Sequence, residues 1–168
     1  MANQLAHDPQ VVLVVDFGAQ YAQLIARRVR EAQVYSEIVP HKITAQEVLN
    51  RKPIAIILSG GPASVHVDGA PVLDPQIYEL GIPILGICYG MQTMTEQLDG
   101  TVLSSTHREF GYAQINFDPV NPLFEGINER DRLLDVWMSH GDRVEDLPRG
   151  FTSIANSENS PLAAISNQ

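Results

Sequence analysis

Three short runs of apolar residues constrain the fold of this chain more than any other feature of its sequence. They span Val11–Val15, Ile54–Leu58 and Ile82–Ile87. None of them alternates between apolar and polar residues, which is the pattern of strands buried on both faces of a parallel sheet. A segment with helical spacing of apolar residues, Tyr21–Val29, lies between the first two runs. Strands that alternate with helices predict an α/β fold: a doubly wound, mostly parallel sheet with helices on both faces.

Further elements follow from local signals in the sequence. A weaker strand is predicted over Val34–Val39, and a second helix is predicted over about Thr44–Asn50. Thr44 is followed three residues later by Glu47, which predicts a capping box at the start of this helix. A third helix is predicted after Cys88, and Gly100 is a suitable C-cap residue for it.

The second half of the chain has shorter, more alternating segments, which predict antiparallel strands added along an edge of the sheet. These segments are Thr101–Ser104, Tyr112–Phe117, Leu133–Ser139 and Thr152–Asn156. Residues 1–10 are polar and are interpreted as a flexible lead-in, so the predicted domain covers residues 11–168.

Composition argues against several classes of function. The formal net charge of −9 argues against a nucleic-acid-binding surface, which needs clustered Lys and Arg. No apolar run approaches the roughly 20 residues that span a bilayer, so no membrane association is predicted. A single cysteine leaves no internal disulfide and fits a cytoplasmic protein. The cysteine and the scattered histidines lack ligand spacing, so no metal site is predicted.

The single cysteine, Cys88, lies where the third apolar run gives way to a helix, with Gly86 and Gly90 on either side. Glycines in these positions permit a crowded strand-to-helix turn, as in the serine version of the nucleophile elbow. The amino end of a helix also favours the thiolate, which is the reactive form. We interpret Cys88 as a nucleophile. The alternative is a buried cysteine that packs as a small hydrophobe.

A thiolate that attacks a carbonyl group needs N–H donors for the oxyanion, and losing one donor costs on the order of 2.7–4 kcal/mol of barrier. In elbow enzymes one donor is the amide after the nucleophile, here Tyr89. Gly60 and Gly61 follow the run Ile54–Leu58 and are the best source of a second donor, because glycine lets the backbone approach a substrate closely. Strand ends converge in such sheets, so one site is expected. Alternatively, these glycines only form a tight turn.

The sequence does not assign a base to this nucleophile. The five histidines are His7, His41, His66, His107 and His140. His140 is the most interesting, because Ser139-His140-Gly141-Asp142 is expected to form a polar turn at a strand end. A hydrogen-bonded loop histidine explains the same pattern equally well. No histidine has a carboxylate partner at a recognisable spacing.

The motifs around Cys88 resemble those of the class I glutamine amidotransferases, whose fold is flavodoxin-like. Gly86–Gln92 is similar to the nucleophile motif of that family, and Ser59–Pro62 is similar to its oxyanion loop. Three further motifs resemble the GMP synthetase branch of the family: Asp16–Tyr21, Glu109–Ala113 and Trp137–Asp142.

The resemblance implies that Cys88 attacks the side-chain amide of L-glutamine, which releases ammonia and leaves a glutamyl thioester for water to hydrolyse. The amides of Gly61 and Tyr89 would hold the oxyanion. Further residues would contact the glutamine: Gly60, Gln92, Ser139, Gly141 and Asp142.

The resemblance also implies a partner for this domain. Ammonia would pass to an ATP-pyrophosphatase synthetase domain of the same protein, which uses ATP and Mg to aminate XMP to GMP. The amidotransferase domain itself would need no cofactor, and the intact enzyme could be a homodimer. The His-Pro-Glu motif that supplies base and orienter in the family is not in this sequence. We therefore expect the domain to be truncated before its catalytic His/Glu, and weakly active or inactive.

Two other functions stay open on the sequence alone. One is another triad-type amidotransferase or a γ-glutamyl hydrolase, which would use the same nucleophile on a related substrate. The other is a non-catalytic amidotransferase-like module for binding or regulation, in which Cys88 is only a buried thiol.

Overall fold

The structure, a computed structural model, describes residues 10–127 and 132–167, without the side chains of residues 105–110 and 139–140. The chain forms two compact units. Unit 1 contains the residues up to 63 together with 71–91, and unit 2 contains 64–70 together with the residues from 92 onward.

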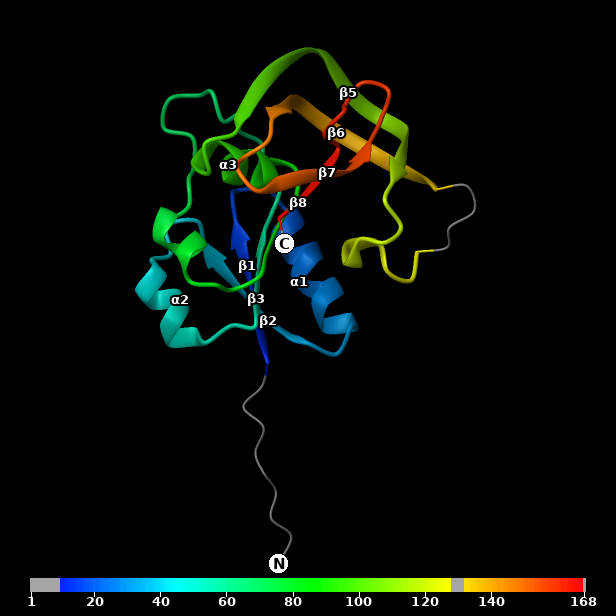
Figure 1. Cartoon of the computed structure of the whole chain (residues 1–168). Helices are drawn as coiled ribbons and strands as arrows, with labels where there is room; N and C mark the ends of the chain where they lie inside the picture. Colours follow the sequence, from blue (N-terminus) through cyan, green and yellow to red (C-terminus); the bar gives the residue numbers. More distant parts are fainter. Residues whose placement is uncertain (1–9, 128–131, 168) are drawn as a thin grey trace, which may run out of the picture. The chain divides into compact units, whose positions relative to one another are not determined.

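Unit 1 is built on a sheet of four parallel strands in the order β2-β1-β3-β4 (Figure 1). The strands are β1 (Val11–Asp16), β2 (Tyr35–Pro40), β3 (Ala55–Leu58) and β4 (Ile84–Gly86). They confirm the three apolar runs and the weaker fourth strand. In β1, Leu13, Val14 and Val15 are at most 1% exposed, so both faces of this central strand are covered, as the absence of alternation predicts.

Two α-helices and a short 3₁₀-helix accompany this sheet: α1 (Tyr21–Glu31), α2 (Ala45–Arg51) and η1 (Pro75–Glu79). Helix α1 packs Ala22 and Ala26 against Val14 of β1. Helix α2 begins with the predicted capping box. The Thr44 hydroxyl accepts from the Glu47 N–H, and the Glu47 carboxylate accepts from the Thr44 N–H at 2.9 Å.

Helix α3 (Tyr89–Gln97) ends in a Schellman motif. Gly100, the predicted C-cap residue, does not take the left-handed conformation of this motif. Asp99 takes the left-handed conformation, with φ of 65°, and the Gly100 N–H bonds to the Thr95 carbonyl at 2.8 Å. Glycine at position 100 is instead explained by crowding. A Cβ there would come within 2.6 Å of the Thr95 methyl group and 2.8 Å of the Asp146 carbonyl oxygen.

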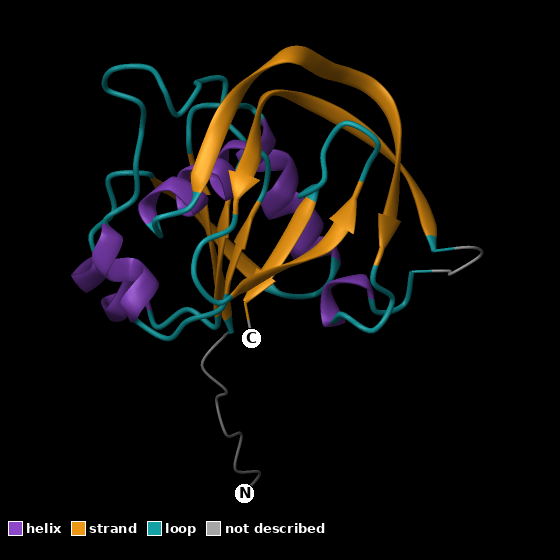
Figure 2. Cartoon of the chain, turned by 45° about the horizontal axis from the view of Figure 1, so that its top comes forward, coloured by secondary structure: helices purple, strands orange, loops and turns teal. Residues whose placement is uncertain are grey.

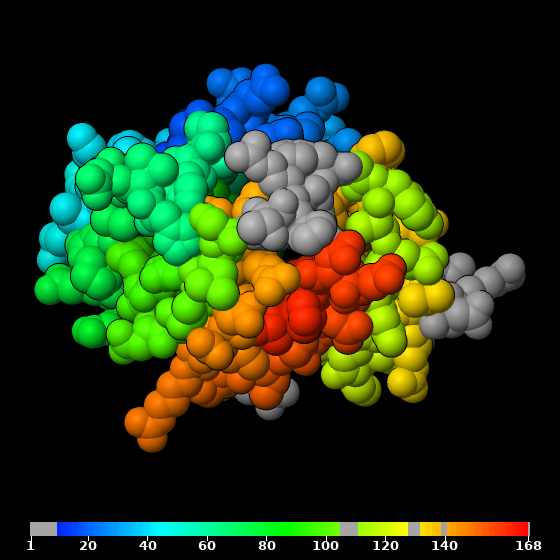
Figure 3. Space-filling view, turned by 90° about the horizontal axis from the view of Figure 1, so that it is seen from above, coloured from blue at the N-terminus to red at the C-terminus, as the bar shows by residue number. Residues whose placement is uncertain are grey.

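Unit 2 contains a second sheet of four strands in the order β6-β5-β7-β8, all paired antiparallel. The strands are β5 (Thr101–Phe117), β6 (Leu133–Asp146), β7 (Phe151–Asn156) and β8 (Ala164–Asn167). The two long strands β5 and β6 are conspicuous in Figure 2, and β7 pairs with β8. The last part of the chain, which contains these two strands, forms the orange to red surface in Figure 3. The antiparallel segments were expected along an edge of the parallel sheet. They pair with one another instead, because β5 and β6 are long enough to satisfy each other's backbone groups.

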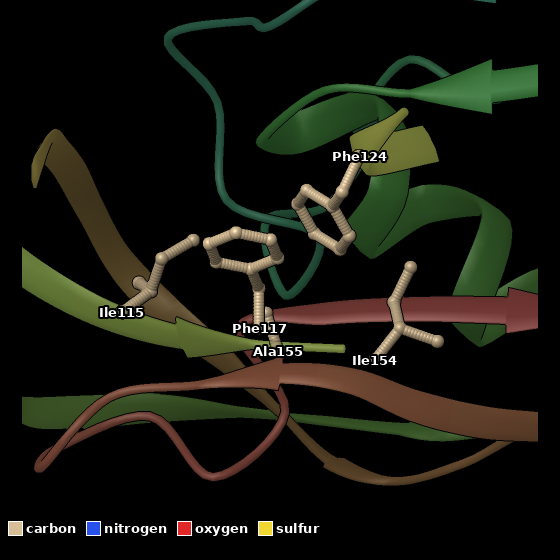
Figure 4. Close-up of a cluster of buried hydrophobic side chains, with 5 residues drawn as sticks. All are labelled: Ile115, Phe117, Phe124, Ile154 and Ala155. Carbon is tan, nitrogen blue, oxygen red and sulfur yellow. The ribbon is translucent and has the colours of Figure 1, made fainter. Parts of the chain in front are cut away.

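The core of unit 2 lies on one face of this sheet. Ile115 and Phe117 of β5 pack with Ile154 and Ala155 of β7 and with Phe124 of η2 (Pro122–Phe124) (Figure 4). On the opposite face of the β5–β6 pair, the paired residues Tyr112 and Trp137 are exposed. Among the described residues, no helix is long and apolar enough to cross a membrane.

Candidate active site

Cys88 occupies the turn between β4 and α3, in a backbone conformation that non-glycine residues rarely adopt. Its φ is +50°, in the left-handed region. Such a residue costs on the order of 1–3 kcal/mol and persists only where the surrounding structure holds it. A strained residue on a strand-to-helix turn is the geometry of a nucleophile elbow.

The glycines on either side of Cys88 are required by close backbone contacts. A Cβ on Gly86 would lie 2.7 Å from the backbone N and Cα of Met91, in the first turn of α3. A Cβ on Gly90 would overlap the carbonyl oxygen of Leu58 at the end of β3. The prediction that these glycines permit a crowded turn is therefore confirmed.

Cys88 is exposed to solvent as a residue, so the alternative of a buried cysteine does not describe it. Nearby protein atoms nevertheless displace part of its water, and this desolvation raises the pKa of Cys88 above its ordinary value. The amino end of the helix was expected to favour the thiolate, whereas desolvation acts in the other direction. This direction favours the protonated thiol over the reactive thiolate.

The predicted oxyanion loop lies against the elbow, as expected from the converging strand ends. A Cβ placed on Gly60 would be 3.7 Å from the Cβ of Cys88 and 3.9 Å from the carbonyl oxygen of Ile87. A Cβ on Gly61 would be 3.3 Å from the ring of Tyr89. The structure thus brings together Cys88, Tyr89 and both glycines.

Phe17 and Ser59 hold this loop, although neither was predicted to have an individual role in the site. The Phe17 N–H donates to the hydroxyl of Ser59 at 3.2 Å, and that hydroxyl donates to the Gly60 carbonyl at 2.9 Å. The Phe17 ring also packs against the Tyr89 ring, with centroids 5.3 Å apart. Both residues lie in segments that resemble family motifs, and each directly follows a buried strand.

An open pocket of 370 Å³ lies beside Phe17 at the carboxyl ends of β1 and β2, formed by residues 16–18 and 38–41. The ring of His41 stacks on Phe17, with centroids 6.1 Å apart and planes at 19°. His41 lies in the turn that follows β2 and is half-buried beside this pocket.

The remaining predicted glutamine contacts belong to unit 2. Gln92 and Asp142 are both buried, and the Gln92 side-chain amide donates to the Asp142 carbonyl at 2.9 Å. The Asp142 carboxylate accepts from the Ser104 hydroxyl at 3.2 Å. The structure therefore brings Gln92 and Asp142 together, and it commits at least one N–H of Gln92 to a bond inside the protein.

Strand β6 continues through Gly141, so the predicted polar turn at this position is wrong. Residues 139, 140 and 142 pair with β5 instead, in a ladder whose register is irregular between Ser104 and Glu109. The ladder uses backbone groups, which the polar side chains do not disturb. The side chains of Ser139 and His140 lie outside the described residues, as do His7 and the side chain of His107.

Among the side chains that the structure describes, which exclude those of residues 105–110 and 139–140, no three His, Cys, Asp or Glu cluster closely enough to hold a metal ion.

Comparison with known proteins places these features in a family. A model of the family "glutamine amidotransferase class-I" matches residues 13–168. The chain is 54% identical over 165 residues to the glutamine-hydrolyzing GMP synthase of Corynebacterium diphtheriae, covering 98% of this chain and 31% of that protein. It is 54% identical over 157 residues to the enzyme of the same name from Aquifex aeolicus, covering 94% and 30%. The chain thus spans about a third of the length of these curated relatives.

A solved structure shows the same fold. It is that of a Thermoplasma acidophilum protein described as a candidate GMP synthase component, which superposes with a TM-score of 0.83 at 28% sequence identity. The superposition covers 96% of this chain and 80% of that one.

Proposed function

The chain belongs to the class I glutamine amidotransferase family, and we propose that it releases ammonia from the side-chain amide of L-glutamine with Cys88 as the nucleophile. The observation that carries this proposal is the solvent-exposed residue Cys88, held at a φ of +50° beside the Gly60–Gly61 loop. An inert thiol would not require a strained backbone at a solvent-exposed turn.

The reaction has two covalent steps. The Cys88 sulfur gives its proton to a base and attacks the amide carbon of glutamine, forming a tetrahedral oxyanion that the N–H groups of Gly61 and Tyr89 stabilise. The carbon–nitrogen bond then breaks, the nitrogen takes up a proton and leaves as ammonia, and a γ-glutamyl thioester remains on Cys88. Water attacks the thioester carbon, which releases glutamate and restores the thiol.

The remaining predicted residues would bind the substrate. Gly60 leaves space next to the thiol, because its missing side chain would lie 3.7 Å from the Cβ of Cys88. Gln92, Ser139, Gly141 and Asp142 are proposed to hold the amino-acid end of glutamine. The buried Gln92–Asp142 hydrogen bond would keep two of them in fixed positions.

We propose that a base must take the proton of the Cys88 thiol before the attack, because desolvation disfavours the thiolate, and that glutamine hydrolysis is slow without this base. Desolvation favours the neutral thiol, so little thiolate is present at neutral pH unless a base takes the proton. We propose that this base comes from a His-Pro-Glu motif, which this sequence does not contain.

The names of the relatives support a use for the ammonia. We propose that it is passed to an ATP-pyrophosphatase synthetase domain, which would use ATP and Mg to aminate XMP to GMP in the cytoplasm. The support is the 54% identity to two proteins named glutamine-hydrolyzing GMP synthase, of which this chain matches only 31% and 30%.

Ammonia release from glutamine tests the proposal. The 168-residue chain should release little, whereas a chimera that continues into the unmatched part of the Corynebacterium diphtheriae relative should release ammonia in a Cys88-dependent way. Cys88→Ala in the chimera should abolish the release. A chimera that hydrolyses glutamine equally well with Cys88→Ala would show that another residue is the nucleophile, and a preference for γ-glutamyl peptides would favour a γ-glutamyl hydrolase.

A further inference from the structure

Ser59 lies completely buried at the end of β3, and its hydroxyl joins two backbone segments. Its exposed fraction is 0%. The hydroxyl oxygen accepts from the Phe17 N–H at 3.2 Å, and the hydroxyl hydrogen is donated to the Gly60 carbonyl at 2.9 Å. We propose that Ser59 is a positioning residue that fixes the direction of the Gly61 N–H in the oxyanion hole. The inference rests on the function proposed for Cys88.

A single peptide group links the Ser59 hydroxyl to the Gly61 N–H. The carbonyl of Gly60 and the N–H of Gly61 belong to the same planar unit, and in a trans peptide they point in opposite directions. No cis peptide occurs in the described part of the chain. A hydrogen bond that fixes the Gly60 carbonyl toward Ser59 therefore turns the Gly61 N–H away from Ser59.

The orientation of the peptide between Gly60 and Gly61 needs a constraint. Both residues that flank it are glycines, which have no Cβ to restrict their dihedral angles, so the peptide plane could rotate at low cost. The Phe17 N–H occupies one acceptor site on Ser59 and leaves the hydroxyl hydrogen for Gly60. Because Ser59 is inaccessible to solvent, water cannot replace this hydroxyl without a rearrangement.

The loop that contains Gly61 packs closely against its neighbours. A Cβ on Gly61 would be 3.1 Å from the Cβ and carbonyl oxygen of Phe17 and 3.3 Å from the Tyr89 ring. The loop is therefore held between Phe17 and Tyr89, the residue directly after the nucleophile. With this side packed, the Ser59 bond decides which way the peptide faces.

The experiment compares two reagents on Cys88, the single cysteine of the chain. A chloroketone analogue of glutamine presents a carbonyl that develops an oxyanion during attack, whereas iodoacetamide alkylates by displacement without one. The ratio of the two rate constants reports on the oxyanion hole. The fraction of thiolate cancels in this ratio, so the missing base does not affect it.

The variant is Ser59→Ala, and Ser36→Ala is its matched control. Ser36 is also 0% exposed, and its hydroxyl donates to the Ala26 carbonyl at 3.0 Å, away from the elbow. We expect Ser59→Ala to lower the chloroketone-to-iodoacetamide ratio by roughly tenfold, below the 10²–10³ reported for complete loss of a donor. Ser36→Ala should leave the ratio unchanged, and Ser59→Thr, which keeps a hydroxyl, should restore most of it.

Each outcome decides a different claim. An unchanged ratio in folded Ser59→Ala overturns the role of Ser59 while the function proposed for Cys88 stands. If the unmodified protein itself has no higher ratio than a free thiol, the proposed function is wrong, and so is this assignment. If Ser59→Ala does not fold, the NMR resonance of the Gly61 amide is measured in the unmodified protein instead. Formation of the chloroketone adduct should shift it, and an unshifted resonance contradicts the proposal.

Discussion

Gly90 lies so close to the Leu58 carbonyl that a side chain at position 90 would overlap the carbonyl oxygen and come within 2.7 Å of the carbonyl carbon. The same carbonyl accepts a hydrogen bond from the Ile87 N–H at 3.0 Å. The end of β3 therefore supports the elbow on both sides of Cys88. This support holds the backbone of Cys88 in its strained conformation, which positions the thiol.

Gly90→Ala should destabilise the protein by about 1–3 kcal/mol, because the methyl group meets backbone atoms that cannot move independently. Urea unfolding measures the effect. Gly60→Ala is the control, since a Cβ there makes only ordinary contacts, at 3.7 Å and beyond. Its stability should change by less than about 1 kcal/mol. Equal losses in the two variants would contradict the overlap with Leu58.

Alkylation of Cys88 by iodoacetamide should depend on pH with an apparent pKa above the ordinary thiol value of about 8.5, because desolvation disfavours the thiolate. In urea the apparent pKa should return to that ordinary value. The shift also has a consequence for stability. A folded-state pKa that is raised contributes stability below the unfolded pKa, and this stability is lost as pH rises through the folded value. An apparent pKa below that of a free thiol would contradict this account.

Gln92→Glu should destabilise unit 2 by about 1–3 kcal/mol at neutral pH, because the introduced carboxylate cannot donate to the buried Asp142 carbonyl. The loss should shrink at low pH, where the protonated carboxyl regains a donor. Gln114→Glu is the control, because the Gln114 amide bonds to the Asp135 carboxylate at an exposed position. A change there should cost about 0.5 kcal/mol or less. Similar losses at both positions would show that the Gln92 bond is unimportant.

Thr44→Ala should cost about 1 kcal/mol through loss of the helix cap, and Thr44→Ser should keep most of the stability. The Thr44 N–H, and then its hydroxyl, hold the pKa of Glu47 below its ordinary value. The contribution of Glu47 to the free energy of unfolding is present above its ordinary pKa of about 4.3. It is lost as the pH falls through the lowered pKa of the folded state. Thermal unfolding between pH 7 and pH 3 should therefore show the Thr44→Ala difference narrowing. A difference that stays constant would contradict the capping box.

The sequence was sufficient for those features that depend on local composition. Uninterrupted apolar runs predicted the parallel strands, and the spacing of Thr44 and Glu47 predicted a cap that the structure contains. The glycines around Cys88 predicted the crowded turn because their role is local. Asp99, by contrast, was not recognised as the left-handed residue at the end of α3, since glycine at position 100 offered a stronger signal for a different reason.

Features that depend on distant partners could not be predicted. The hydrogen bond from Phe17 to Ser59 joins residues 42 positions apart, so neither residue carries a local sign of it. The path of β6 through Gly141 depends on backbone pairing with β5, which polar side chains do not reveal. The desolvation that raises the pKa of Cys88 is likewise a property of the folded surroundings.

The measurement that tests the central claim most directly is labelling of the 168-residue chain by a chloroketone analogue of glutamine, with the adduct located by mass spectrometry. Our account predicts an adduct on Cys88 that forms faster than with a free thiol and is suppressed by L-glutamine but not by L-asparagine. Labelling that is no faster than that of a free thiol, or that glutamine does not suppress, would contradict Cys88 as a glutamine-attacking nucleophile.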